Sequence, residues 1–154
     1  MRPRSYSVRV IAFLGLIASA WANETLDVLV NAAASFSSTI RQQLEMVQSN
    51  PSPVDLVEKT IDYAEAKGAY FQALRAELPL VKSAGGRSAD LDTFAAALAV
   101  AGEEEKRAEA ATLILLKRFS HNRDVARTML ELQRAQAVER KFQKDYEGLD
   151  LKDH

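Results

Sequence analysis

Apolar residues recur every three or four positions along most of the chain, which is the spacing that places them on one face of an α-helix. The pattern is clearest over residues 24–49, where one stripe contains Leu26, Leu29, Ala33, Phe36, Ile40, Leu44 and Val47. Three further stripes follow, over residues 53–83, 88–119 and 123–147. The pattern therefore predicts four helices.

The boundaries of these helices carry specific signals. Pro51 and Pro53 separate the first two helices, because the residue before a proline is disfavoured in the helical conformation. Ser52 followed by Pro53 is typical of an N-cap and a first helical position. Gly148 is expected to end the last helix, which leaves residues 149–154 as a flexible tail.

Signals for β-strands are weak, since the chain shows neither alternation of β-branched residues nor an Asn-Gly or Asp-Gly hairpin turn. Long helices joined by short connections are typical of antiparallel neighbours. We therefore expect an all-α fold, a single four-helix bundle with up-down-up-down topology over residues 23–148. A three-helix arrangement with a hairpin is the alternative.

The segment before the first helix has the pattern of a secretory signal peptide, over residues 1–22. Three arginines and no acid occupy its first nine residues, residues 8–20 form an apolar run, and Ala20 and Ala22 are the small residues of a cleavage site. We expect cleavage between Ala22 and Asn23. The apolar run is roughly 13 residues long and thus shorter than the roughly 20 residues that span a bilayer. An uncleaved membrane anchor is the alternative.

The composition limits the classes of function. Cleavage would remove three basic residues and leave 17 basic and 21 acidic residues, a net charge of −4, which argues against a nucleic-acid partner. The chain has no cysteine, which excludes disulfides, thioether-linked haem, iron–sulfur ligation and thiol nucleophiles. We expect a periplasmic or secreted protein with no membrane contact except through an uncleaved signal sequence.

The residues that usually carry chemistry in helical bundles are scarce. Carboxylate-bridged di-metal sites use Glu-x-x-His pairs on two helices, but the chain has only His121 and His154, and Arg118 lies three residues before His121. The glycines at 85 and 86 lack the lysine and the spacing of a phosphate-binding loop. The sequence therefore predicts no catalytic residue, no cofactor and no metal.

One acidic residue interrupts the apolar stripe of the third helix. The stripe passes through Glu105, which lies just after Gly102. Either the helix breaks near Gly102, or a carboxylate enters the core with a raised pKa. The interpretation we favour is a solvated charged face, with Gly102 shifting the stripe.

Two groups of residues are candidates for an interaction surface. Tyr63 and Tyr70 share one flank of the second helix, where tyrosines often seal the edge of a core or contact a partner. Arg118, His121 and Arg123 bracket the turn between the last two helices and could bind an anionic partner. Alternatively, positively charged side chains near a helix C-terminus stabilise that helix through its dipole.

These observations predict a non-enzymatic, exported helical-bundle protein of the cell envelope. We expect it to act through protein–protein interaction, with another envelope protein or with a second copy of itself. The alternative is a periplasmic carrier or sensor that binds a small apolar ligand between the helices, because alanine-rich helix faces permit either close packing or a cavity.

Overall fold

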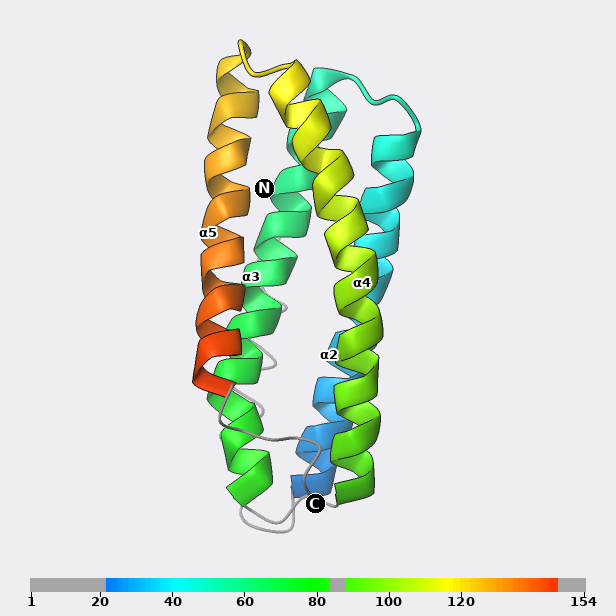
Figure 1. Cartoon of the computed structure of the whole chain (residues 1–154), viewed down its shortest axis with the longest axis vertical. Coiled ribbons are helices and arrows are strands. Elements are labelled where there is room, and N and C mark those ends of the chain that lie inside the picture. The colour runs from blue at the N-terminus through cyan, green and yellow to red at the C-terminus, as the bar shows by residue number, and fades with distance from the viewer. Residues whose placement is uncertain (1–21, 84–87, 147–154) are drawn as a thin grey trace.

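The computed structural model describes residues 22–83 and 88–146 (Figure 1). Their helices are α2 (Ala22–Gln48), α3 (Pro53–Ser83), α4 (Ser88–Arg118) and α5 (Arg123–Tyr146). The predicted all-α class with four helices is confirmed for these ranges, and each boundary lies within two residues of its predicted position. The tail at 149–154 and, except for Ala22, the signal peptide lie outside the described residues.

Polar side chains cap the helices at the two described turns. The Ser52 hydroxyl accepts a hydrogen bond from the backbone N–H of Asp55 at 3.2 Å, as expected of an N-cap. Asn122 does the same for α5, where its side-chain oxygen accepts from the N–H of Asp124 at 2.9 Å. Asn50, after the end of α2, has a φ of 56°, a left-handed conformation that asparagine tolerates well. The sequence therefore dictates these boundaries locally.

The helices do not all pack against their neighbours in sequence (Figure 1). α2 packs extensively against α3 and α4, and α3 packs extensively against α5. α4 makes only sparse contacts with α3 and α5. The expectation that short connections make consecutive helices close neighbours is therefore correct for α2 and α3. It does not hold for α3 and α4 or for α4 and α5, which make only sparse contacts.

Aromatic side chains fill the core between α2, α3 and α5. The ring of Phe36 lies 4.9 Å from that of Tyr70, 5.9 Å from that of Phe71 and 6.1 Å from that of Tyr63, measured between centroids. Phe71 in turn lies 5.5 Å from Phe142 of α5. These separations are typical of favourable aromatic pairs. Phe36 is therefore the centre of the aromatic core.

α4 continues without interruption through Gly102, so the helix break that the sequence left open is absent. α3 likewise continues through Pro79 to Ser83. A Cβ atom added at Gly102 would meet no heavy atom within 4 Å. The glycine is thus not required by close packing.

We expect Gly102→Ala to raise the free energy of unfolding by about 0.5–1 kcal/mol, because alanine loses less conformational entropy in a helix interior. Urea denaturation followed by circular dichroism measures this change. Gly68→Ala should stabilise the protein for the same reason, since a Cβ atom added at Gly68 would also meet no heavy atom within 4 Å. A loss of stability in both variants would contradict the observed geometry.

Candidate functional site

A lysine lies inside the bundle, at the middle of α3. Tyr63, Lys67 and Tyr70 are spaced four and three residues apart and therefore share one face of the helix. That face points into the core, and Lys67 is only 1% exposed. Because a buried ammonium group without a counter-charge is very costly, the surroundings of Lys67 must supply one.

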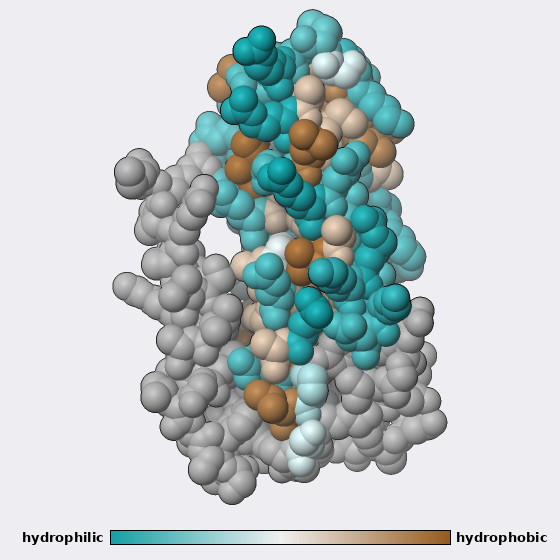
Figure 2. Space-filling view, turned by 90° about the vertical axis from the view of Figure 1, so that its left-hand side faces the viewer, coloured by the Kyte–Doolittle hydropathy of each residue, from teal (hydrophilic) through white to brown (hydrophobic). Residues whose placement is uncertain are grey.

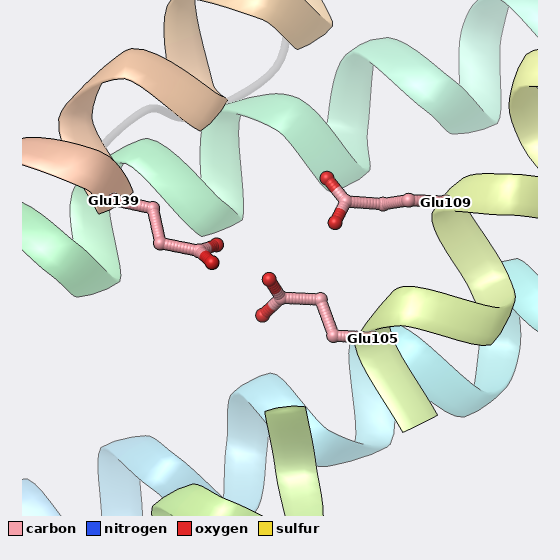
Figure 3. Close-up of side chains that lie close together, drawn as sticks. All are labelled: Glu105, Glu109 and Glu139. Atoms are coloured by element: carbon pink, nitrogen blue, oxygen red, sulfur yellow. The ribbon is translucent and has the colours of Figure 1, made fainter. Parts of the chain in front are cut away.

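Three carboxylates surround the Lys67 ammonium. Glu105 and Glu109 lie one turn apart on α4, and Glu139 comes from α5; Figure 3 shows their carboxylates converging. Lys67 Nζ lies 2.9 Å from Glu105 Oε1, 2.7 Å from Glu109 Oε1 and 2.5 Å from Glu139 Oε2. These four residues are called the Lys67 cluster below. It joins three helices through one charged group.

Glu105 is the most deeply buried of the three carboxylates. The side chain of Glu105 is 6% exposed, whereas those of Glu109 and Glu139 are 14% and 18% exposed. Gln136 of α5 donates a further hydrogen bond to Glu109 Oε1 at 3.2 Å. One lysine faces three acids, so the four groups carry a net charge of −2 if all are ionised. A bound proton would reduce this imbalance.

The pKa values indicate where that proton resides. Burial first of all, together with a hydrogen bond to Glu139 and the charge of Glu139, raises the pKa of Glu105 to about 9, although Lys67 opposes the shift. Burial alone would lower the pKa of Lys67, but Glu109 and Glu105 outweigh it and the pKa is raised. These shifts favour, at neutral pH, an ammonium group on Lys67 and a proton on Glu105.

The buried position of Glu105 corrects our sequence interpretation. We favoured a solvated face with the stripe shifted at Gly102, but the helix is continuous and Glu105 is 4% exposed. The alternative of a buried acid with a raised pKa is the correct one. The physical reason is Lys67 on a different helix, whose ammonium group donates a hydrogen bond to the buried carboxyl group of Glu105.

The two tyrosines of the predicted interaction surface lie in the core. Tyr63 is 1% and Tyr70 is 7% exposed, so neither is available to a partner in this conformation. Both hydroxyl groups are buried without a hydrogen-bond partner among the described residues. Burial raises both pKa values, and the nearby carboxylates of the cluster add to this. The hydroxyls therefore stay protonated.

The other residues of the predicted surface lie elsewhere. Arg118, His121 and Arg123 are exposed around the turn between α4 and α5. The two candidate groups therefore lie in different parts of the molecule, one in the core and one at its surface. Only the basic group remains on the outside.

A second polar layer accompanies the Lys67 cluster in the core. Gln43 of α2 donates hydrogen bonds to Thr60 of α3 at 3.0 Å and to Thr112 of α4 at 3.2 Å. Thr112 donates to the carbonyl of Ala108 at 2.7 Å, so its hydroxyl is satisfied. A layer with complete hydrogen bonds fixes the register of these helices, since a shifted register would leave buried polar atoms without partners.

The sequence prediction missed Lys67 and Glu139 altogether. A signal was present, because Lys67 continues the series Thr60, Tyr63, Lys67, Tyr70 and Leu74 at helical spacing. A lysine within such a stripe, together with an acid within the stripe of another helix, indicates a buried ion pair. However, neither the lysine nor the acid shows by itself on which helix its partner lies.

The carboxylate oxygens of Glu105, Glu109 and Glu139 lie within 4.8 Å of one another, close enough to bind a metal ion. The Lys67 ammonium contacts all three and supplies the positive charge that such a group needs. The three carboxylates therefore form a site for a cation, and the Lys67 ammonium group occupies it.

The raised pKa of Glu105 makes stability depend on pH. Between its ordinary pKa of about 4.5 and its folded pKa of about 9, the folded chain holds a proton that the unfolded chain releases. The free energy of unfolding should therefore fall as pH rises through this range. Lys67, whose pKa is raised, loses its stabilising contribution only above its ordinary pKa.

We expect Glu105→Gln to flatten this dependence, because glutamine imitates the protonated acid and has no proton to release. Urea denaturation of both proteins at pH 5, 7 and 9 measures the slopes. Glu103→Gln, at an exposed position on the same helix, is the matched control and should retain the wild-type slope. Equal slopes in the wild type and Glu105→Gln would contradict the assignment.

The fold and the site together define an all-α four-helix bundle with a lysine and three glutamates in its core. No protein-family model matches the chain, and no curated protein and no solved structure matches it significantly.

Proposed function

We propose that the chain is an exported, non-enzymatic protein of the cell envelope that acts by binding another protein. The bundle would be antiparallel with up-down-up-down topology, which the course of the chain in Figure 1 supports. The Lys67 cluster is closed off and its groups are paired with one another, which favours a structural role for it over catalysis on a substrate.

Exposed apolar side chains near the turn between α4 and α5 are the observation that carries this proposal. Ile114 on α4 is 63% exposed and Leu130 on α5 is 54% exposed. In Figure 2, apolar side chains interrupt the hydrophilic surface of the face on the α5 side, mainly in its upper half. Arg118 and Arg123 are exposed at the same end. Apolar residues with a basic surround are typical of protein interaction sites.

A photo-crosslinking residue placed at Ile114 or Leu130 tests this proposal in the native cells. We expect a discrete adduct from each position, identified by mass spectrometry as another envelope protein or a second copy of the chain. Gln72, which is exposed on α3, is the control position and should give no adduct. Absence of adducts at 114 and 130 would contradict the proposal.

Export rests on the pattern of residues 1–22 and has its own test. We expect the exported protein to have a mass that begins at Asn23 in a denaturing mass spectrum. Retention of residues 1–22 would instead favour the membrane-anchored alternative. None of the helices within residues 22–83 and 88–146 combines the length and the apolar character needed to cross a membrane.

The carrier of a small apolar ligand remains the alternative. The contacts of Phe36 with three other rings support a filled core between α2, α3 and α5 and thus disfavour a cavity there. Extra mass from a bound small molecule in a native mass spectrum would favour the carrier.

A further inference from the structure

One boundary of the bundle is much less packed than the others. α2 is packed extensively on both of its neighbours, and α3 on α5, but α4 contacts α3 and α5 only sparsely. Figure 1 shows α4 and α5 close together at their shared turn and apart below it. The backbone of α4 therefore comes close to those of α3 and α5 at few positions only.

The Lys67 cluster lies across this sparse boundary. Lys67 on α3 donates hydrogen bonds to Glu105 and Glu109 on α4, at 2.9 and 2.7 Å. From α5, Gln136 donates to Glu109 at 3.2 Å, and carboxyl oxygens of Glu139 and Glu105 lie within 4.8 Å of each other. Each of these interactions joins α4 to one of the two helices that it otherwise barely contacts.

We propose that the Lys67 cluster is a proton-dependent latch, which holds α4 against α3 and α5 while Glu105 is protonated and releases the α4–α5 seam when the proton leaves. The protonated Glu105 donates to Glu139 across the seam. Loss of that proton removes the donor and places two negative charges from different helices against each other. The inference does not depend on the proposed partner.

The charged groups that face Glu105 determine the direction of this effect. α3 contributes Lys67, which attracts the ionised acid, and the neutral hydroxyls of Tyr63 and Tyr70. α5 contributes Glu139, and α4 itself contributes Glu109, both of which oppose a further negative charge. On α2 the described titratable residues, Asp27, Arg41 and Glu45, are exposed. One lysine thus faces three carboxylates once the proton is lost, and α4 and α5 repel each other.

The absence of cysteine permits a direct test by paired spin labels on the mature chain. Lys106→Cys with Gln133→Cys places labels at exposed positions on α4 and α5, across the seam. Gln72→Cys with Lys141→Cys spans α3 and α5, which pack extensively, and is the control pair. Distances are measured by pulsed electron spin resonance at pH 7 and pH 10, with and without Glu105→Gln.

We expect the α4–α5 distance to lengthen and broaden at pH 10 in the wild-type background, with no change in the control pair. Glu105→Gln should keep the seam distance the same at both pH values. An unchanged α4–α5 distance in the wild type would overturn the proposal, as would a lengthening that persists with Glu105→Gln. A simultaneous change in the control pair would indicate global unfolding and would equally overturn it.

Discussion

Replacing Lys67 with methionine is expected to lower the free energy of unfolding by about 3–5 kcal/mol at pH 7, the usual cost of removing one partner of a buried ion pair. Methionine nearly matches the length of lysine, so the loss of volume is small. The cost arises from Glu105, Glu109 and Glu139, which lose the ammonium group that contacts all three. Urea denaturation followed by circular dichroism measures the change.

Two comparisons separate the charge effect from other effects of the substitution. Lys59→Met, at an exposed position on the same helix, should change stability by less than about 0.5 kcal/mol. Glu109→Gln combined with Lys67→Met should cost less than the sum of the two single changes, because it removes a carboxylate that lysine would otherwise balance. A loss below about 1 kcal/mol for Lys67→Met alone would contradict a buried, charged Lys67.

The second large effect is expected at the aromatic core. Phe36→Ala should lower the free energy of unfolding by about 3–5 kcal/mol, through lost burial and the cavity left behind. Phe36 is 4% exposed and its ring contacts those of Tyr63, Tyr70 and Phe71. Removing it therefore affects the packing between α2 and α3.

Leu44→Ala is the matched control for this prediction, since Leu44 lies on the same stripe of α2 but is only half-buried. Its cost should be clearly smaller than that of Phe36→Ala. Thermal denaturation and urea denaturation should rank the two variants in the same order. Equal costs would mean that the aromatic contacts add nothing beyond the burial of one apolar side chain.

The helices of this protein could be predicted well because local signals determine them. The stripe of α2 predicted the core, with Leu26, Phe36 and Ile40 buried as expected. Ser52 caps α3 through a hydrogen bond to a residue three positions away. Such signals depend on a few neighbouring residues, so they can be identified without knowledge of the tertiary packing.

The Lys67 cluster could not be predicted in the same way because it depends on the arrangement of the helices. Lys67 and Glu105 are 38 positions apart, and Glu139 comes from a further helix. Taken one helix at a time, Glu105 and Glu109 indicate repulsion on a solvated face. Their burial follows only once α3 places an ammonium group between α4 and α5.

The arrangement also explains why the two tyrosines lie in the core and not at its edge. α3 packs against both α2 and α5, so more than one of its faces is buried. A single apolar stripe therefore underestimates how much of α3 is covered. Tyr63 and Tyr70 lie within the covered part and contact Phe36.

A proton on Glu105 inside the bundle at neutral pH underlies both the pH dependence of stability and the proposed latch. Its side-chain carboxyl carbon, labelled with carbon-13 and followed by nuclear magnetic resonance across pH 4 to 10, reports its protonation directly. Glu105→Gln assigns the signal by its disappearance. We expect the resonance to remain at the position of a protonated acid at pH 7 and to titrate near pH 9. Titration near the ordinary pKa of 4.5 would show an ionised Glu105 and contradict the account.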